Sequence, residues 1–152
     1  MSSPRALAWR AWAPAALHGL LIWSVSSLSH PDFLPVADIP LRDKGVHFLV
    51  FGVFGFLVAH GAVRTRPAWS LLGVFALAAL ATVVWGAVDE AHQYFVPGRD
   101  SDPLDVLADA LGGLGGAGLR VVAAALGARA LGGKAGAGRL AEPRSARDTG
   151  PP

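Results

Sequence analysis

Acidic residues and histidines gather in three short segments that lie far apart in the sequence. In chain order, the polar residues of these segments are Asp43, Lys44 and His47, then Asp89, Glu90, His92 and Gln93, and then Arg99, Asp102, Asp105 and Asp109. Carboxylates and imidazoles transfer protons and bind divalent cations, and lysine and arginine bind phosphates and carboxylates. We take all of these side chains as candidate binding residues, and His47, Asp89 and Glu90 as the candidates for acid–base catalysis.

Four apolar stretches must position these segments: residues 11–29, 46–63, 67–88 and 104–126. Each is close to the roughly 20 residues that a helix needs to cross about 30 Å of hydrocarbon. In a bilayer, a helix satisfies its own backbone hydrogen bonds and the lipid accepts its apolar side chains. Hydrophobic residues make up 53% of the chain and charged residues only 16%, which agrees with this environment. The sequence therefore predicts an all-α membrane protein, a compact bundle of four transmembrane helices.

The charges of the connections predict the orientation of this bundle. Lysine and arginine concentrate in the N-terminal segment, in the connection at residues 64–66 and after residue 119, whereas most acids lie in the other two connections, including Asp32, Asp38 and Asp100. Cytoplasmic loops carry an excess of lysine and arginine, so we expect both termini in the cytoplasm. The expected location is the plasma membrane, with the lipid bilayer as partner. No basic-aromatic motif of nucleic-acid binding is present, so no nucleic acid is expected.

We divide the chain into a cytoplasmic N-terminus (residues 1–10), one membrane domain (11–131) and a disordered cytoplasmic tail (132–152). The tail lacks the bulky apolar residues that offset the entropy of ordering. An alternative for the first apolar stretch is a cleaved signal peptide, because Arg5 and Arg10 precede it; however, the run is long for such a segment and three further stretches follow. The absence of cysteine excludes disulfides and thiolate sites.

Some of the polar residues have simpler structural explanations. Asp43 and Asp102 precede apolar stretches and could serve as helix N-caps, with Asp102 directly before Pro103. Asp89 and Glu90 lie near the end of a helix, where the helix dipole disfavours acids. Asp109 is deeper in its span and too short to reach the headgroups, so we expect it to be buried near Asp89 or His47.

The order and spacing of several motifs resemble those of the VanZ-like family of small polytopic membrane proteins. The motifs are Asp43-Lys44-x-x-His47-Phe48 with Phe51, Gly52, Gly55, Phe56 and Leu57 after it, Asp89-Glu90-x-x-Gln93, Pro97-Gly98-Arg99, and Asp105-Val106-Leu107 followed by Gly112 and Gly116. The resemblance covers about residues 20–120. One position departs from the family pattern, because Asp109 stands where the family usually has Asn. The family's namesake is linked to resistance to the glycopeptide teicoplanin, but the resemblance implies no reaction.

Three hypotheses fit this sequence. In the first, a polar pocket at the outer leaflet recognises an envelope lipid, a lipid-linked wall precursor or a glycopeptide, with Lys44 and Arg99 contacting phosphate or carboxylate. In the second, the protein is an enzyme acting on such a lipid, and its metal-assisted version would use Asp43, His47, Asp89 and His92 as ligands. In the third, the polar residues form a structural lock or dock a partner, and channel or carrier action is a weaker fourth alternative. The sequence assigns no cofactor and no oligomeric state, and for the Gly112 and Gly116 pair it favours packing within the bundle over dimerisation.

Overall fold

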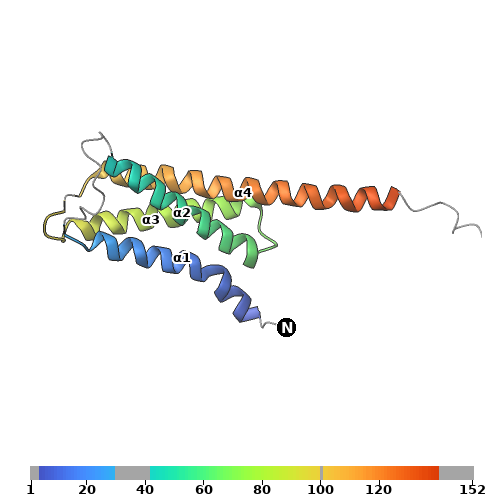
Figure 1. Ribbon diagram of the computed structural model, residues 1–152, viewed down its shortest axis with the longest axis horizontal. Coiled ribbons are helices and arrows are strands. Elements are labelled where there is room, and N and C mark those ends of the chain that lie inside the picture. Colours follow the sequence, from blue (N-terminus) through green and yellow to red (C-terminus); the bar gives the residue numbers. More distant parts are fainter. Residues whose placement is uncertain (1–3, 30–41, 100, 141–152) are drawn as a thin grey trace, which may run out of the picture.

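The computed structural model describes residues 4–29, 42–99 and 101–140, and all regular structure in these ranges is helical. The helices are α1 (Pro4–Ser26), α2 (Arg42–Thr65), α3 (Leu71–Gln93) and α4 (Pro103–Leu140). They alternate in direction, and α4 projects beyond the others (Figure 1). The all-α prediction is confirmed. Part of the predicted orientation depends on three acids, Asp32, Asp38 and Asp100. These acids lie outside the described residues.

Three of the described helices are long and apolar enough to cross a membrane, over Asp43–Thr65, Leu71–Gln93 and Pro103–Ala130. Their outward surfaces carry large exposed apolar side chains, among them Leu49, Leu72, Leu80 and Leu119. Such side chains are suited to contact with lipid. Helix α1 does not belong to this group, since Arg10, Pro14 and His18 interrupt its apolar residues. The fourth span therefore remains a prediction.

Helices α2 and α4 pack against each other so closely that only glycine fits at several positions. A Cβ atom on Gly116 would overlap the carbonyl oxygen of Gly52, and one on Gly112 would overlap that of Phe48. Gly55 meets Gly113 in the same way. Small residues at a helix interface allow this approach in membrane proteins. The prediction that Gly112 and Gly116 serve packing within the bundle is confirmed.

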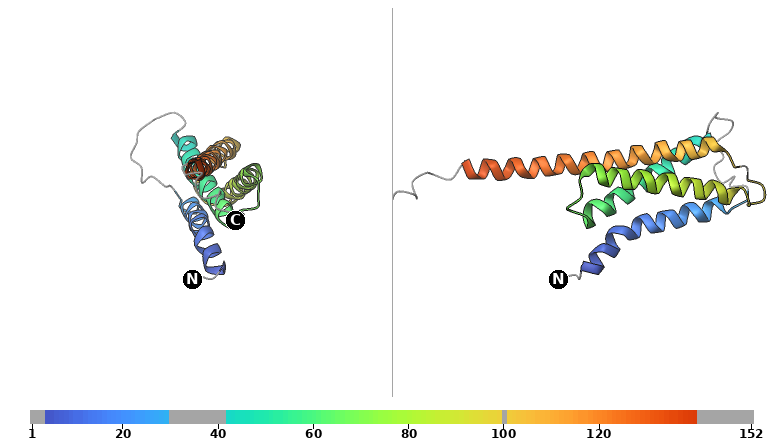
Figure 2. Two further views of the ribbon diagram at one scale, coloured as in Figure 1. Left: turned by 90° about the vertical axis from the view of Figure 1, so that its right-hand side faces the viewer. Right: turned by 180° about the vertical axis from the view of Figure 1, so that it is seen from behind.

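Helix α1 lies against α2 and α3 and, within the described chain, away from α4 (Figure 2). Two polar contacts attach it to α2. Trp12 Nε1 donates a hydrogen bond to Thr65 Oγ1 at 3.1 Å, and His18 Nε2 lies 3.0 Å from the carbonyl oxygen of Val50. His18 therefore packs between α1 and α2, where its ring also stacks on Phe54.

Several helix boundaries differ from the predicted spans: α1 begins at Pro4, α2 begins at Arg42 and α3 ends at Gln93, and two further differences have an identifiable local context. Helix α3 begins at Leu71 rather than at residue 67, because Ser70 is its N-cap and accepts a hydrogen bond from the backbone N–H of Gly73 at 3.1 Å. Helix α4 continues to Leu140, into the segment predicted to be disordered. The glycines of this segment disfavour a helix, so its composition does not explain the extension, although no proline interrupts it before Pro143. Residues 141–152 lie outside the described residues.

The alternating directions bring four helix ends together at one end of the bundle (Figures 1 and 2). These are the C-terminal ends of α1 and α3 and the N-terminal ends of α2 and α4. We call this end, which carries the three polar segments, the polar end. The connection between α2 and α3 lies at the opposite end.

Candidate functional site

Lys44 on α2 joins three acids of the polar end. Its Nζ lies 2.8 Å from Asp43 Oδ2, 2.6 Å from Asp102 Oδ2 and 2.9 Å from Asp105 Oδ1. The contacts with Asp43 and Asp102 are hydrogen bonds, whereas the geometry at Asp105 is that of an ion pair alone. The hydrogen bond from Lys44 holds the pKa of Asp102 below its ordinary value. Asp102 also caps α4, since its Oδ1 accepts from the backbone N–H of Leu104 at 2.9 Å, which confirms the capping prediction.

Asp109 forms the deepest polar contact of the site. Its side chain is completely buried, and its Oδ1 lies 2.9 Å from His47 Nδ1. An ionised Asp109 accepts a hydrogen bond from the Nδ1–H group, which leaves Nε2 as the free ring nitrogen. The absence of a side chain at Gly86 makes room for this carboxylate, because a Cβ atom there would lie 2.8 Å from Asp109 Oδ2. The predicted burial of Asp109 beside His47 is confirmed.

Glu90 connects α3 to the start of α4. Its Oε2 accepts hydrogen bonds from the backbone N–H of Asp102 at 2.8 Å and from Ser101 Oγ at 3.2 Å. Only 4% of Glu90 is exposed, and both of its donors are neutral. The carboxylate therefore has no cation paired with it among the described residues.

Asp89 and His92 face α1 instead of this cluster. Asp89 Oδ2 accepts hydrogen bonds from Ser26 Oγ at 2.9 Å and from Gln93 Nε2 at 2.8 Å. The ring of His92 stacks on Trp23 with centroids 3.9 Å apart, and its Nε2 lies 2.9 Å from Ser27 Oγ. The polar end thus contains two groups. The inner cluster consists of Lys44, His47, Glu90, Asp102, Asp105 and Asp109, and the α1-facing group consists of Ser26, Ser27, Asp89, His92 and Gln93.

Several buried polar atoms of the polar end have no hydrogen-bond partner among the described residues. They are Asp89 Oδ1, Glu90 Oε1, Arg99 Nε, Asp105 Oδ1 and Asp109 Oδ2. Native proteins satisfy the great majority of such atoms, and an unsatisfied one costs about 1–3 kcal/mol. Arg99 also forms no ion pair with a described residue. The site is therefore able to accept both hydrogen-bond donors and an anion.

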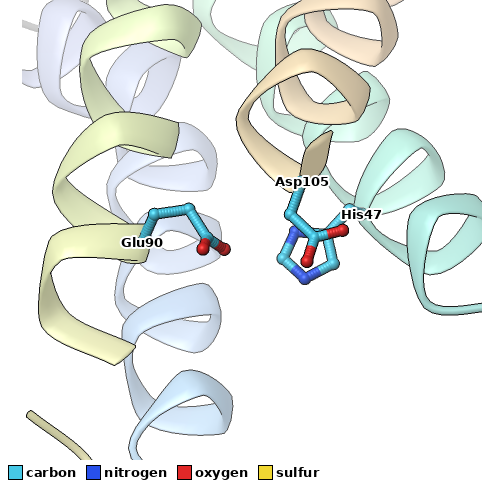
Figure 3. Close-up of side chains that lie close together, drawn as sticks. All are labelled: His47, Glu90 and Asp105. Carbon is cyan, nitrogen blue, oxygen red and sulfur yellow. The ribbon is translucent and has the colours of Figure 1, made fainter. Parts of the chain in front are cut away.

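The geometry also groups three residues that could hold a metal ion. One ligand atom from each of His47, Glu90 and Asp105 lies within 4.8 Å of the other two. The three side chains come from α2, α3 and α4, and the Glu90 carboxylate points toward the other two residues (Figure 3). This set shares only His47 with the metal ligands suggested from the sequence. Asp89 and His92 face α1, which separates them from Asp43 on the far side of the cluster.

Other functional side chains of the polar end were not identified as site residues from the sequence. Ser26 and Ser27 bind Asp89 and His92, and Ser101 binds Glu90. Serine is common near helix ends, so its residue type and position in the sequence do not identify it as a site residue. The sequence also does not identify Gly86 as a site residue. Its role is to leave room for the buried side chain of Asp109, which belongs to another helix.

Comparison with protein families supports the assignment suggested by the motifs. The sequence matches the VanZ/LLP1 family over residues 11–124. Searches of the curated proteins and of the solved structures each found no match. The matched region includes all three polar segments, the whole of the apolar helices Asp43–Thr65 and Leu71–Gln93, and most of Pro103–Ala130. Since it covers most of the chain, this membrane protein belongs to the VanZ/LLP1 family.

Proposed function

We propose that this protein uses its polar end to recognise an envelope lipid, a lipid-linked wall precursor or a glycopeptide at the outer face of the plasma membrane. In this arrangement α1 is the fourth span and both termini lie in the cytoplasm. The distribution of cations supports the orientation, because Arg64 and Arg66 lie at the opposite end of the bundle and Arg129 lies near the far end of α4.

The observation that carries this proposal is the set of unpartnered buried atoms. A cluster that served only to lock the helices together would satisfy its polar groups internally, since each unsatisfied group costs stability. Here Glu90 and Asp109 each keep a carboxylate oxygen without a partner among the described residues, and the Nε of Arg99 has none either. A ligand that offers both donors and an anionic group would satisfy them.

The chemistry of the site indicates which ligand groups it would contact. Amines and hydroxyl groups would donate to the free oxygen of Glu90, and a phosphate or carboxylate would accept from the guanidinium of Arg99. Lys44 has a different role from the one suggested by the sequence. Because three carboxylates surround its Nζ, it neutralises the cluster and is not available to a ligand.

The substitution Arg99→Ala tests the proposal in a teicoplanin-sensitive host that expresses the protein. We expect it to abolish protection against teicoplanin while the amount of protein in the membrane stays unchanged. Arg129→Ala is the matched control, because it removes the same charge from an exposed position near the far end of α4 and should retain protection. Unchanged protection with Arg99→Ala would exclude this residue from recognition.

A second candidate function is catalysis on the same class of lipid. The pairing of His47 with buried Asp109 favours it, since an acid that fixes one ring nitrogen leaves the other to accept or donate a proton. Glu90 is the second acid–base group within reach of this site. No serine or cysteine nucleophile accompanies the pair in the described inner cluster, so the nucleophile would be water or a hydroxyl group of the lipid.

The substitution His47→Gln separates the two candidates. If the protein is an enzyme, mass spectrometry of the envelope lipids should show a modified species in cells with the unaltered protein and its loss in cells with His47→Gln. Glutamine retains a hydrogen-bonding side chain but cannot exchange a proton near neutral pH. Identical lipid profiles in expressing and non-expressing cells would argue against catalysis and leave recognition as the function.

A further inference from the structure

The inner cluster contains more buried negative charge than its cations balance. Asp105 is paired with Lys44 and Asp109 with His47, whereas Glu90 accepts only from neutral donors. Lys44 also serves Asp43 and Asp102. A buried carboxylate must be paired, be protonated or bind a metal, because an isolated buried charge is costly.

Two carboxylates of the inner cluster lie where a cation would use them. Glu90 Oε1 is buried without a hydrogen-bond partner among the described residues, Asp105 Oδ1 is already paired with a cation, Lys44, at 2.9 Å, and both residues are more than nine-tenths buried. Their carboxylates and the ring of His47 lie in one group, with ligand atoms all within 4.8 Å of one another (Figure 3). Ligand atoms at about 2.1 Å from one ion are at most about 4.2 Å apart. The side chain of Glu90 has enough rotatable bonds to close the remaining gap.

His47 is oriented as a metal ligand is in many proteins. Metal-binding histidines usually donate their second ring N–H to a carboxylate, which fixes the tautomer and makes the ligating nitrogen more basic. Asp109 provides such a carboxylate, and it is held by complete burial against the backbone of Gly86. His47 itself is partly exposed, with 15% of its side chain accessible, so an ion has a path into the site.

Lys44 does not block this arrangement. Its Nζ contacts Asp105 Oδ1 without forming a hydrogen bond, whereas its bonds to Asp43 and Asp102 are at 2.8 and 2.6 Å. An ion bound to Asp105 would leave Lys44 with two carboxylate partners. The metal ion would replace Lys44 as the cation beside Asp105, and it would also neutralise Glu90.

We infer that His47, Glu90 and Asp105 bind one divalent transition-metal ion, Zn²⁺ or Mn²⁺. Imidazole is a common ligand of zinc, and carboxylates bind both zinc and manganese. Three protein ligands leave at least one coordination position open, as in metal sites that bind a water molecule or a substrate oxygen. The inference goes beyond the proposed function, because the ion binds whether or not an envelope lipid is recognised.

Metal binding to the purified full-length protein tests this inference. The protein is stripped with a chelator in detergent, titrated separately with Zn²⁺ and Mn²⁺ without added lipid, and its metal content is measured by mass spectrometry. We expect one ion per chain for at least one of the two metals. Glu90→Gln and His47→Gln should each weaken binding at least about tenfold.

His60→Gln is the matched control, since it repeats the substitution of His47→Gln on the same helix but at the opposite end of the bundle. There His60 Nδ1 accepts from Arg120 Nε at 3.3 Å, outside the ligand set. We expect this variant to bind the ion as the unaltered protein does. The failure of Glu90→Gln to fold would be recognised from its thermal unfolding without metal. Copper-loaded protein then provides a second readout, because its electron paramagnetic resonance spectrum should show coupling to an imidazole nitrogen that His47→Gln removes.

Two results would overturn the inference. One is the absence of a stoichiometric ion in the unaltered protein with both metals. The other is equal binding by the unaltered protein, Glu90→Gln and His47→Gln, which would place the ion elsewhere. Both results leave the teicoplanin experiment with Arg99→Ala unaffected, so failure of the metal site and failure of the proposed function are distinguishable.

Discussion

The type and position of Asp109 are enough to predict its burial and to limit its partner to two residues. An acid inside an apolar span is costly unless it has a partner, so the sequence predicts its burial and narrows the partner to His47 or Asp89. The structure selects His47 and adds a condition that the sequence does not reveal, the absence of a side chain at Gly86. The resemblance described above implies Asn at this position, which raises the question of what the negative charge of Asp109 contributes.

We predict that Asp109→Asn is tolerated, whereas Asp109→Ala is not. The asparagine oxygen can accept the same hydrogen bond from His47 Nδ1–H, so the free energy of unfolding should change by less than about 1 kcal/mol. Alanine leaves the imidazole N–H without a partner and should cost about 1–3 kcal/mol. Equilibrium unfolding in detergent measures both values. A loss with asparagine as large as that with alanine would mean that the charge, and not the hydrogen bond, stabilises this position.

At the scale of the helices, the sequence predicts boundaries where a cap or a proline marks them. Asp102 before Pro103 correctly gives the start of α4. The apolar stretch that predicts α3 begins at residue 67, whereas the helix begins at Leu71. In the structure Arg66 stacks on Trp69, with its guanidinium 5.8 Å from the ring centroid, and the helix begins only after Ser70. Competing local contacts of this kind cannot be ranked from sequence alone.

The close contact between α2 and α4 predicts that alanine changes the free energy of unfolding differently at two neighbouring glycines. Gly116→Ala should destabilise the protein by about 1–3 kcal/mol, because its Cβ overlaps the carbonyl oxygen of Gly52 and forces the helices apart. Gly115→Ala should be neutral or stabilise by up to about 1 kcal/mol, since nothing lies within 4 Å of its Cβ and alanine favours the helix. Equilibrium unfolding of the two variants checks the difference. Equal effects would show that α2 and α4 are not in this close contact.

For the whole molecule, the alternation of helix direction is the feature that brings distant residues together. The order of apolar and polar segments predicts that residues 43–47, 89–93 and 101–109 meet at one end, and they do. It does not predict the rotation of each helix about its axis. Helix α3 directs Glu90 to the inner cluster but Asp89 and His92 to α1, so one predicted group becomes two. That division depends on packing contacts such as Trp23 on His92, which link residues far apart in the sequence.

The path of the whole chain through the membrane is the last prediction, and the absence of native cysteine makes it directly testable. Single cysteines at Ser3 and Ser145 report the two ends of the chain, and Tyr94→Cys, at an exposed side chain, reports the polar end. With four spans, an impermeant maleimide added to intact cells should label only Tyr94→Cys. If α1 does not cross, the two ends of the chain lie on opposite sides, and Ser3→Cys should be labelled together with Tyr94→Cys. Labelling of Ser3→Cys and Ser145→Cys without Tyr94→Cys would instead reverse the orientation and place the inner cluster in the cytoplasm, where it could not meet an extracellular glycopeptide.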